Sequence, residues 1–398
     1  MKFANPFKPG AGHMPPHLAG RGQETRDFAR LLGQKTILKN AVLTGLRGVG
    51  KTVLLETWKP LAIRRKWLWV GTDLSESASV SEETLVIRFL TDLSVVTSGL
   101  VLRQPKAKGF GEEFKEERIG YDKLIELYKK APGLPSDKLK SILEFVWERL
   151  KPLGFKGIVF AYDEAQTMSD HAEKEQYPLS LLLDVFQSIQ KKGVPFLLVL
   201  VGLPTLFSKL VDTRTFSERM FEVIILTKLN ESDSREAITE PLKKKRCPIT
   251  FPSKTVDLII VTSGGYPFFI QFICRELYDV FIQKIDIGEE LRVPMDEIVR
   301  KLDKDFFAGR WGKATDRQRV LLSVIAHLNR ADDEFTVQEI VVESQTLKNP
   351  FSNSHVNQML ATLIDTGLIY KNRHGRYLFA VPLLGEFILR QMEDEDVV

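Results

Sequence analysis

Residues 45–52 read GLRGVGKT and combine the residue types and the spacing that phosphate binding requires, G-x-x-x-x-G-K-[ST]. Glycines let backbone N–H groups converge on phosphate oxygens, and a helix that starts here adds the partial positive charge of its N-terminus. Lys51 would reach the β- and γ-phosphates of a nucleotide, and the Thr52 hydroxyl would ligate Mg²⁺. The run follows an expected strand and opens an expected helix, which predicts a phosphate-binding loop. Its members are Gly45, Leu46, Arg47, Gly48, Val49, Gly50, Lys51 and Thr52.

A second run, GIVFAYDEAQ at residues 157–166, is an apolar strand that ends in two adjacent carboxylates. Asp163 can hold Mg²⁺, through water or the Thr52 hydroxyl, while Glu164 polarises the attacking water. The competing interpretation is an Asp-Glu pair that caps a helix. With the loop upstream, the pair predicts hydrolysis of a bound nucleotide.

Composition sets the class of protein. The 398 residues predict two or three domains, and 43% apolar with 27% charged residues is the balance of a soluble globular chain. Two cysteines are too few for a disulfide framework or a structural zinc site, and a net charge of +4 does not by itself indicate nucleic acid. The longest apolar run, residues 194–204, is about half a membrane span. We therefore expect a cytoplasmic location and no membrane contact.

The order of expected elements predicts an α/β fold with a parallel sheet covered on both faces. Strands are expected at 41–44, 67–72, 157–162, 196–202 and 221–226, and helices at 51–59, 83–93, 138–150 and 179–192. Further helices are expected at 121–130, 232–245, 253–262, 267–284 and 294–307. The last part predicts helices at 317–329, 337–342 and 354–366, followed by a hairpin of 368–370 and 377–381, the order of a winged helix. The predicted domains are an extended arm (1–16), a P-loop domain (17–227, insertion about 98–135), a helical lid (228–311) and a winged helix (312–398).

Together these motifs resemble the AAA+ P-loop ATPases, and more closely the branch of the origin-recognition initiators, over residues 15–391. LAGR at 18–21 is similar to the box that lies over the adenine, which implies a nucleotide contact for Arg21. GLRGVGKT and FAYDEAQ are similar to the Walker A and Walker B motifs, and LVGLP at 200–204 ends the next strand. The resemblance implies an ATPase that uses ATP and Mg²⁺.

Three arginines have open roles. Arg219 stands where such families often place the arginine that reaches a neighbouring subunit's nucleotide, which implies a nucleotide-dependent homo-oligomer. The alternatives are a surface arginine paired with a carboxylate, or Arg214 in its place. The Arg47 guanidinium, inside the loop, would face either a phosphate or solvent.

The sequence also departs from the initiators. Gly202 and Leu203 stand where many AAA+ proteins place a polar residue that senses the γ-phosphate, and Thr205 is the nearest hydroxyl. GGYPFF at 264–269 stands in place of the usual lid arginine and resembles the lid motif of the STAND ATPases, in which the proline, here Pro267, lies near bound ADP. The simpler interpretation of this run, a helix N-terminus with proline at its first position, is compatible with both an ATPase and a STAND-type switch. The motif raises an alternative function, a nucleotide-dependent switch with slow hydrolysis that binds protein partners.

Contact with DNA is predicted through the wing, where Lys371, Arg373 and Arg376 would neutralise phosphates. Residues 312–398 hold nine Lys and Arg against twelve Asp and Glu, so packing on a protein is nearly as well supported. The basic run at 243–246 would touch DNA or form the solvated end of a lid helix. The biological process stays open among replication, transposition, plasmid maintenance and antiphage defence.

Overall fold

The computed structural model describes residues 4–99, 101–105, 114–243, 247–287, 292–328 and 334–396. The chain divides into two compact units. We call residues 22–44 and 54–225 the sheet unit, and residues 1–21, 45–53 and 226–398 the helical unit. The last three residues of the predicted basic run at 243–246 lie outside the described residues.

The core of the sheet unit is a five-stranded sheet with the order β2-β5-β6-β1-β7. Its strands are β1 (Asn40–Gly45), β2 (Trp67–Val70), β5 (Gly157–Tyr162), β6 (Phe196–Gly202) and β7 (Phe221–Leu226). β2 pairs with β5, β5 with β6 and β6 with β1, all in parallel. Every residue of β1, β5 and β6 is buried, as expected for strands covered on both faces. The predicted α/β fold class with a parallel sheet is confirmed.

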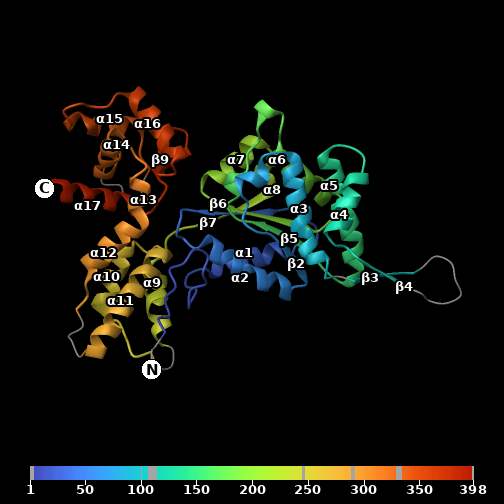
Figure 1. Ribbon diagram of the computed structural model, residues 1–398, viewed down its shortest axis with the longest axis horizontal. Coiled ribbons are helices and arrows are strands. Elements are labelled where there is room, and N and C mark those ends of the chain that lie inside the picture. Colours follow the sequence, from blue (N-terminus) through green and yellow to red (C-terminus); the bar gives the residue numbers. More distant parts are fainter. Residues whose placement is uncertain are drawn as a thin grey trace. The chain divides into compact units, whose positions relative to one another are not determined.

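Helices lie on both faces of this sheet. In Figure 1, α1 and α2 lie below it and α3 and α6 above it. Phe28 of α1 stacks on Trp58 of α2 with ring centroids 4.4 Å apart, and Phe89 of α3 contacts Phe186 of α6 at 6.1 Å. The α-helices of this part of the chain are α1 (Gly22–Leu31), α2 (Lys51–Arg64), α3 (Glu82–Thr97), α4 (Tyr121–Lys130), α5 (Pro135–Leu150), α6 (Pro178–Lys191), α7 (Thr205–Thr213) and α8 (Ser217–Met220). Short 3₁₀ turns are η1 (Glu76–Ser79), η2 (Lys151–Leu153), η3 (Ala165–Thr167) and η4 (Ala172–Lys174).

The insertion after α3 differs from the prediction. Its helix α4 spans the predicted residues, but two strands precede it, β3 (Val101–Pro105) and β4 (Phe114–Arg118), which pair antiparallel. This charge-rich run lacks the alternation of apolar and polar residues that signals a strand, so the pattern did not indicate a hairpin.

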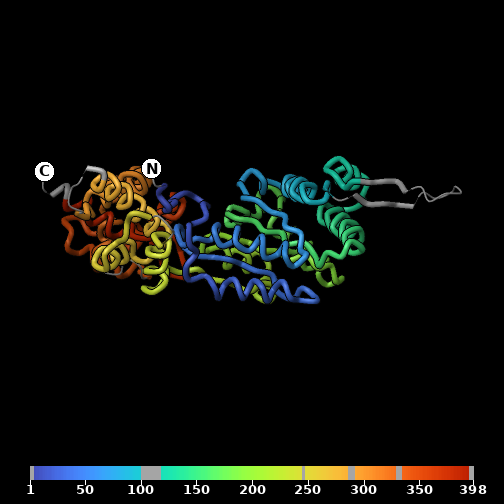
Figure 2. Tube along the Cα trace, turned by 90° about the horizontal axis from the view of Figure 1, so that it is seen from below, coloured from blue at the N-terminus to red at the C-terminus, as the bar shows by residue number. Residues whose placement is uncertain are grey.

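The helical unit begins with a layer of helices and the N-terminal arm. The helices are α9 (Glu231–Thr239), η5 (Glu240–Lys243), α10 (Ser253–Ser263), α11 (Pro267–Ile287), α12 (Met295–Leu302), the π-helix η6 (Asp303–Phe307) and α13 (Ala308–Trp311). The start of the chain lies beside this layer (Figure 1 and Figure 2). Phe7 of the arm is fully buried, with its ring 6.3 Å from that of Phe251 and 6.5 Å from that of Tyr278. Residues 4–20 form no helix or strand. The arm is held by the burial of Phe7 and by hydrogen bonds to α11, such as that from the Lys8 N–H to Gln271 Oε1 at 3.2 Å.

The C-terminal segment of this unit contains α14 (Asp316–His327), α15 (Val337–Glu343), η7 (Ser344–Thr346), α16 (Asn353–Asp365), the antiparallel pair β8 (Ile369–Arg373) and β9 (Arg376–Phe379), and α17 (Leu384–Asp396). We call β8, β9 and their turn the wing. Three helices and a hairpin occur in the predicted order, but α17 was missed. It packs on α14, and Arg390 of α17 makes two hydrogen bonds of 2.9 and 2.6 Å to the Asp303 carboxylate. In the part of the chain that the structure describes, no helix is long and apolar enough to cross a membrane.

The amide of Asn40, only 1% exposed at the start of β1, joins three elements of the sheet unit and yields a stability prediction. Its Oδ1 accepts from Leu198 N–H and from Gln190 Nε2, both at 2.8 Å, and its Nδ2 donates to Gln190 Oε1 at 3.1 Å. Replacing Asn40 by Ala leaves these buried groups unpaired, so we expect the free energy of unfolding in urea to fall by about 2–4 kcal/mol.

The matched control is Asn357→Ala, because Asn357 is exposed on α16 and its side chain donates only to the Asn353 carbonyl four residues earlier. This substitution should change the free energy of unfolding by no more than about 0.5 kcal/mol. Equal losses in the two variants would contradict the role assigned to Asn40.

Candidate functional site

The predicted phosphate loop belongs to the helical unit, after β1 and before the body of α2. Gly48 and Gly50 have φ values of 80° and 94°, a region that residues with a side chain rarely adopt. The loop therefore needs glycine at these two positions to keep its curvature. A Cβ on Gly45 would collide with the Leu226 carbonyl oxygen, so the first glycine is required by close packing.

The ammonium of Lys51 is folded into this loop. Its Nζ donates to the carbonyl oxygens of Gly45 and Leu46, both at 2.9 Å. Lys51 is the first residue of α2, so the positive charge and the helix N-terminus lie at the same end of the loop. This arrangement can attract and orient an anionic phosphate group.

Arg21 is buried and binds the backbone of the loop. Only 7% of the residue is exposed, and its Nη2 donates to the carbonyl oxygens of Val49 at 3.0 Å and Thr227 at 2.9 Å. A buried guanidinium requires such acceptors, because burial without them costs several kcal/mol. The adenine contact implied by the resemblance stays a prediction, and the observed contacts connect the loop to the residue that follows β7.

The predicted lid motif contacts the loop. Pro267 is the first residue of α11, and the N–H of Phe268 donates to the Gly48 carbonyl at 3.1 Å. This amide is one of the N-terminal donors that a helix cannot satisfy internally. Gly265, with φ of 76°, accepts from Leu229 N–H at 2.8 Å, and a Cβ on it would lie 2.6 Å from the Leu229 oxygen. The run at 264–269 therefore contacts both the loop and the segment after β7.

A line of aromatic rings leads from this contact to the C-terminal segment. Phe268 lies 4.9 Å from Phe306, Phe306 lies 5.0 Å from Phe307, and Phe307 stacks on Phe387 of α17 at 5.1 Å, measured between ring centroids. Phe306 and Phe307 belong to the π-helix η6, an irregularity often found at functional sites. The sequence did not predict these ring contacts, because Phe268, the pair Phe306 and Phe307, and Phe387 lie far from one another in the chain.

Arg47 points toward a second cation. Its Nη2 lies 4.0 Å from the position a Cβ on Gly367 would take. The Arg310 guanidinium lies 4.7 Å above the Phe306 ring and donates to the Phe306 carbonyl at 2.7 Å. Burial, together with the positive charge of Arg47, lowers the pKa of Arg310. The charge of Arg47 thus acts on Arg310, an electrostatic coupling that the sequence did not predict.

In the sheet unit, the two predicted carboxylates follow β5. Asp163 is 3% exposed, and its Oδ1 accepts from the N–H of Glu164 at 2.8 Å. Glu164 is exposed and has φ of 54°, a left-handed conformation that costs a residue with a side chain about 1–2 kcal/mol. Its carboxylate accepts a hydrogen bond from the side-chain amide of Gln166, whose Oε1 accepts from Leu203 N–H at 3.1 Å. Gln166 was not among the predicted site residues.

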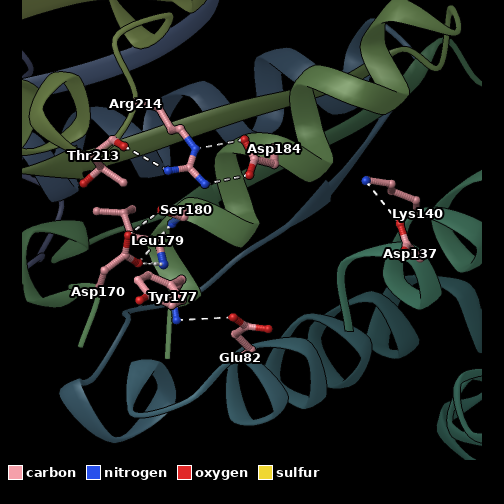
Figure 3. A network of polar contacts seen from close by, with 10 residues as sticks. All are labelled: Glu82, Asp137, Lys140, Asp170, Tyr177, Leu179, Ser180, Asp184, Thr213 and Arg214. Atoms are coloured by element: carbon pink, nitrogen blue, oxygen red, sulfur yellow. Dashed lines mark hydrogen bonds and ion pairs between the residues drawn. The ribbon is translucent and has the colours of Figure 1, made fainter. Parts of the chain in front are cut away.

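The two candidate arginines of this unit differ in their contacts. Arg214 donates from Nε and Nη2 to the two oxygens of Asp184, at 3.1 and 3.0 Å (Figure 3), and this ion pair raises the pKa of Arg214. Arg219, on the short helix α8, is exposed, and within the described ranges its guanidinium makes no ion pair or hydrogen bond. Arg219 is thus accessible to another molecule, whereas Arg214 already has a partner.

A cavity of about 420 Å³ lies in the sheet unit. It is lined by Ser169, Asp170, Tyr177, Ser180, Lys209, Asp212, Thr213 and Arg214. The Asp170 carboxylate accepts from the N–H groups of Leu179 at 2.9 Å and Ser180 at 3.1 Å, so it caps the N-terminus of α6 (Figure 3). Of the candidate residues, Arg214, the alternative to Arg219, lines this cavity.

The predicted Mg²⁺ ligands suit that ion. The Thr52 hydroxyl and the buried Asp163 carboxylate are each oxygen donors of the kind that Mg²⁺ accepts when phosphates and water complete its shell. Thr52 lies in the helical unit and Asp163 in the sheet unit. Among the residues that the structure describes, no group of three or more His, Cys, Asp or Glu is arranged to hold a metal.

The sheet order, with β6 between the strand that precedes the phosphate loop and the strand that precedes the two carboxylates, defines a P-loop α/β fold. Among solved structures, the Aeropyrum pernix ORC2 protein in its ADP form is similar over 96% of this chain and 97% of its own, with 14% identity and a TM-score of 0.55. CDC6P from Pyrobaculum aerophilum is similar over 97% of both chains, with 15% identity and a TM-score of 0.48. The likeness to ORC2 shows the fold of this chain.

The sequence was also compared with family models and with curated proteins. A family model described as a domain of unknown function (DUF8462) matches residues 304–388, from η6 into α17. No curated protein matches the sequence significantly.

Lys51 yields the prediction for this site. Replacing Lys51 by Ala removes the ammonium from the loop without removing a buried apolar side chain, so the protein should stay folded while ATP affinity falls at least tenfold. Isothermal titration calorimetry with ATP and Mg²⁺ measures this, with circular dichroism as the check on folding. The control is Lys59→Ala, which removes an exposed lysine from the same helix. Unchanged ATP affinity in Lys51→Ala would refute the assignment of the loop.

Proposed function

We propose that this protein binds and hydrolyses Mg-ATP and couples turnover to a conformational change. The observation that carries the proposal is the phosphate loop, with glycines in left-handed conformations at 48 and 50 and the Lys51 ammonium folded onto its carbonyl oxygens. A nucleotide phosphate would take over the hydrogen bonds of Lys51, because a charge-assisted bond to phosphate is stronger than a bond to a neutral carbonyl. The fold of the initiators is consistent with this function.

In the proposed reaction each residue has one task. The loop amides and Lys51 bind the β- and γ-phosphates, and Thr52 and Asp163 would hold Mg²⁺, which would neutralise developing charge on the phosphate oxygens. Glu164 accepts a hydrogen bond from the attacking water, orients it toward the γ-phosphorus and takes its proton. The water oxygen forms the new bond to phosphorus as its proton passes to the Glu164 carboxylate, the bond from phosphorus to the β–γ bridging oxygen breaks, and ADP and phosphate leave.

Coupling to the rest of the helical unit is supported by the contact of Gly48 with Phe268. A change in the loop backbone on nucleotide binding would shift the Gly48 carbonyl and with it the N-terminus of α11. The ring contacts from Phe268 to Phe387 would then transmit this shift to the C-terminal segment. The same contact favours the second candidate function, a switch that holds its nucleotide and hydrolyses it slowly, because a bond between lid and loop opposes nucleotide release. Turnover by the wild type separates the two.

We further propose that Arg219 acts on the nucleotide of a second copy of the chain. Its guanidinium is exposed on α8, and an arginine supplied by a neighbour stabilises the charge that spreads over the phosphate oxygens in the transition state. This role requires assembly in the presence of ATP, which size-exclusion chromatography with light scattering would detect. Arg214, bound to Asp184, is the weaker candidate.

For DNA contact through the wing, one of the three wing cations must give up an ion pair within the protein. Lys371 and Arg373 are exposed and Arg376 is half-buried, but Arg373 binds Glu334 through Nε at 3.0 Å and Nη2 at 2.6 Å. This ion pair raises the pKa of Arg373 and lowers that of Glu334. DNA must therefore compete with Glu334 for one of the three wing cations.

Replacing Glu164 by Gln tests the catalytic assignment. The amide keeps the size of the side chain but cannot orient and deprotonate water, so ATP hydrolysis should slow by at least roughly a hundredfold while ATP stays bound. The measurement is phosphate release under saturating Mg-ATP, with calorimetry for binding.

The matched control is Glu175→Gln, since Glu175 is also exposed and also has a left-handed φ, of 53°. It should leave turnover within about twofold of the wild type. Near-normal turnover in Glu164→Gln would assign the catalytic role to another carboxylate. Wild-type turnover already as slow as that of Glu164→Gln, with ATP tightly bound, would favour the switch.

Two sets of wing variants test contact with DNA. Neutralising Lys371, Arg373 and Arg376 together should weaken duplex binding for every sequence and reduce the slope of log K against log salt by about three. Glu334→Gln should tighten binding, because it releases Arg373. Fluorescence anisotropy across a salt series measures both. Tight wild-type binding that neither change affects would exclude the wing as the DNA contact.

A further inference from the structure

The side-chain amide of Gln166 joins the Glu164 carboxylate to the end of β6. Its nitrogen donates to the Glu164 carboxylate, and its oxygen accepts from the N–H of Leu203, just past the end of β6, at 3.1 Å. The chemistry of the partners fixes the orientation of the amide, because a carboxylate accepts only from a donor and an N–H donates only to an acceptor. A primary amide offers both groups in one plane, so a single side chain can serve both partners.

Space for this bridge is provided by Gly202. A Cβ built on Gly202 would lie 2.5 Å from Gln166 Oε1, which is closer than real contacts allow. The end of β6 offers Gly202 and Leu203, and neither has a polar side chain. The amide of Gln166 therefore supplies the polar group at this strand end from a neighbouring turn.

The turn that carries Gln166 is itself held in place. Thr167 Oγ1 donates to the Glu164 carbonyl at 2.9 Å, and Lys209 Nζ donates to the Gln166 carbonyl at 2.8 Å. Lys209 is half-buried, and burial lowers its pKa. The backbone on both sides of the amide is thus fixed by its own contacts, so the amide position does not depend on a flexible loop.

We propose that Gln166 is a positioning residue for hydrolysis, which holds the Glu164 carboxylate and connects it to the end of β6. This inference rests on the proposed ATPase function, in which Glu164 orients water. Glu164 has a left-handed backbone conformation and belongs to no regular helix or strand. The hydrogen bond from the Gln166 side-chain amide therefore restricts the orientation of the Glu164 carboxylate. Because Leu203 is the other anchor, a shift of the β6 end moves the carboxylate with it.

The experiment compares steady-state ATP hydrolysis of the wild type with that of Gln166→Leu and Gln166→Glu. The first removes both hydrogen bonds at similar volume. The second keeps an acceptor for Leu203 N–H but places a like charge beside Glu164. In both variants we expect kcat to fall at least tenfold while the KM for ATP and the thermal midpoint change little. The control is Gln187→Leu, on α6, which should match the wild type because the Gln187 side chain makes no hydrogen bond within the described chain.

A thermodynamic cycle with Glu164→Ala shows whether Gln166 acts through Glu164. With the carboxylate gone, Gln166→Leu should reduce single-turnover hydrolysis by less than about twofold, since residues that act as a unit are non-additive. Normal kcat in both Gln166 variants, or a loss that appears only in KM or in thermal stability, or a full tenfold further loss in the Glu164→Ala background, would overturn the inference. A wild type without hydrolysis would overturn the proposed ATPase function and this inference with it, so the two failures are distinguishable.

Discussion

Burial of the Arg21 charge sets the conditions under which the phosphate loop can exist. A guanidinium that is 7% exposed must keep its donors paired, and its Nη2 does so on the carbonyl oxygens of Val49 and Thr227. These acceptors lie on the loop and just after β7, so the charge can be buried only when both segments are in place. The loop curvature, the start of α2 and the exit from the sheet are consequently fixed together.

The start of α11 and the residue at the end of β7 add a second set of restraints to the same loop. The Phe268 amide binds Gly48, and Gly45 touches the Leu226 carbonyl with no space for a side chain. The positive charge of Arg47, in the loop, also lowers the pKa of Arg310. An anion bound at the loop would reduce this repulsion and would offer Lys51 a charged acceptor in place of two neutral carbonyl oxygens, so the local electrostatics favour an occupied loop.

The strands and the loop could be predicted from the sequence because each depends on local pattern. The buried strands are uninterrupted apolar runs, and β7 spans the residues that its run predicts. The bridge of Gln166 to Leu203, the ring contact of Phe307 with Phe387 and the ion pair of Asp303 with Arg390 join residues from 37 to 87 positions apart. No spacing rule links such pairs, since the fold alone brings them together. The helix α17 escaped prediction because it follows directly on the hairpin that completes a winged-helix pattern.

The place of α17 in the chain has a consequence during synthesis. Its partner α14 is made earlier, and roughly 60 residues are added between the end of α14 and the start of α17, which takes several seconds at ribosomal rates. Through that interval the surface of α14 that α17 later covers has no native partner, and Asp303 lacks the Arg390 charge. The C-terminal segment therefore completes its fold only when its last helix has left the ribosome. A chain whose synthesis stalls before residue 384 would leave the apolar surface of α14 that α17 covers accessible to chaperones and proteases.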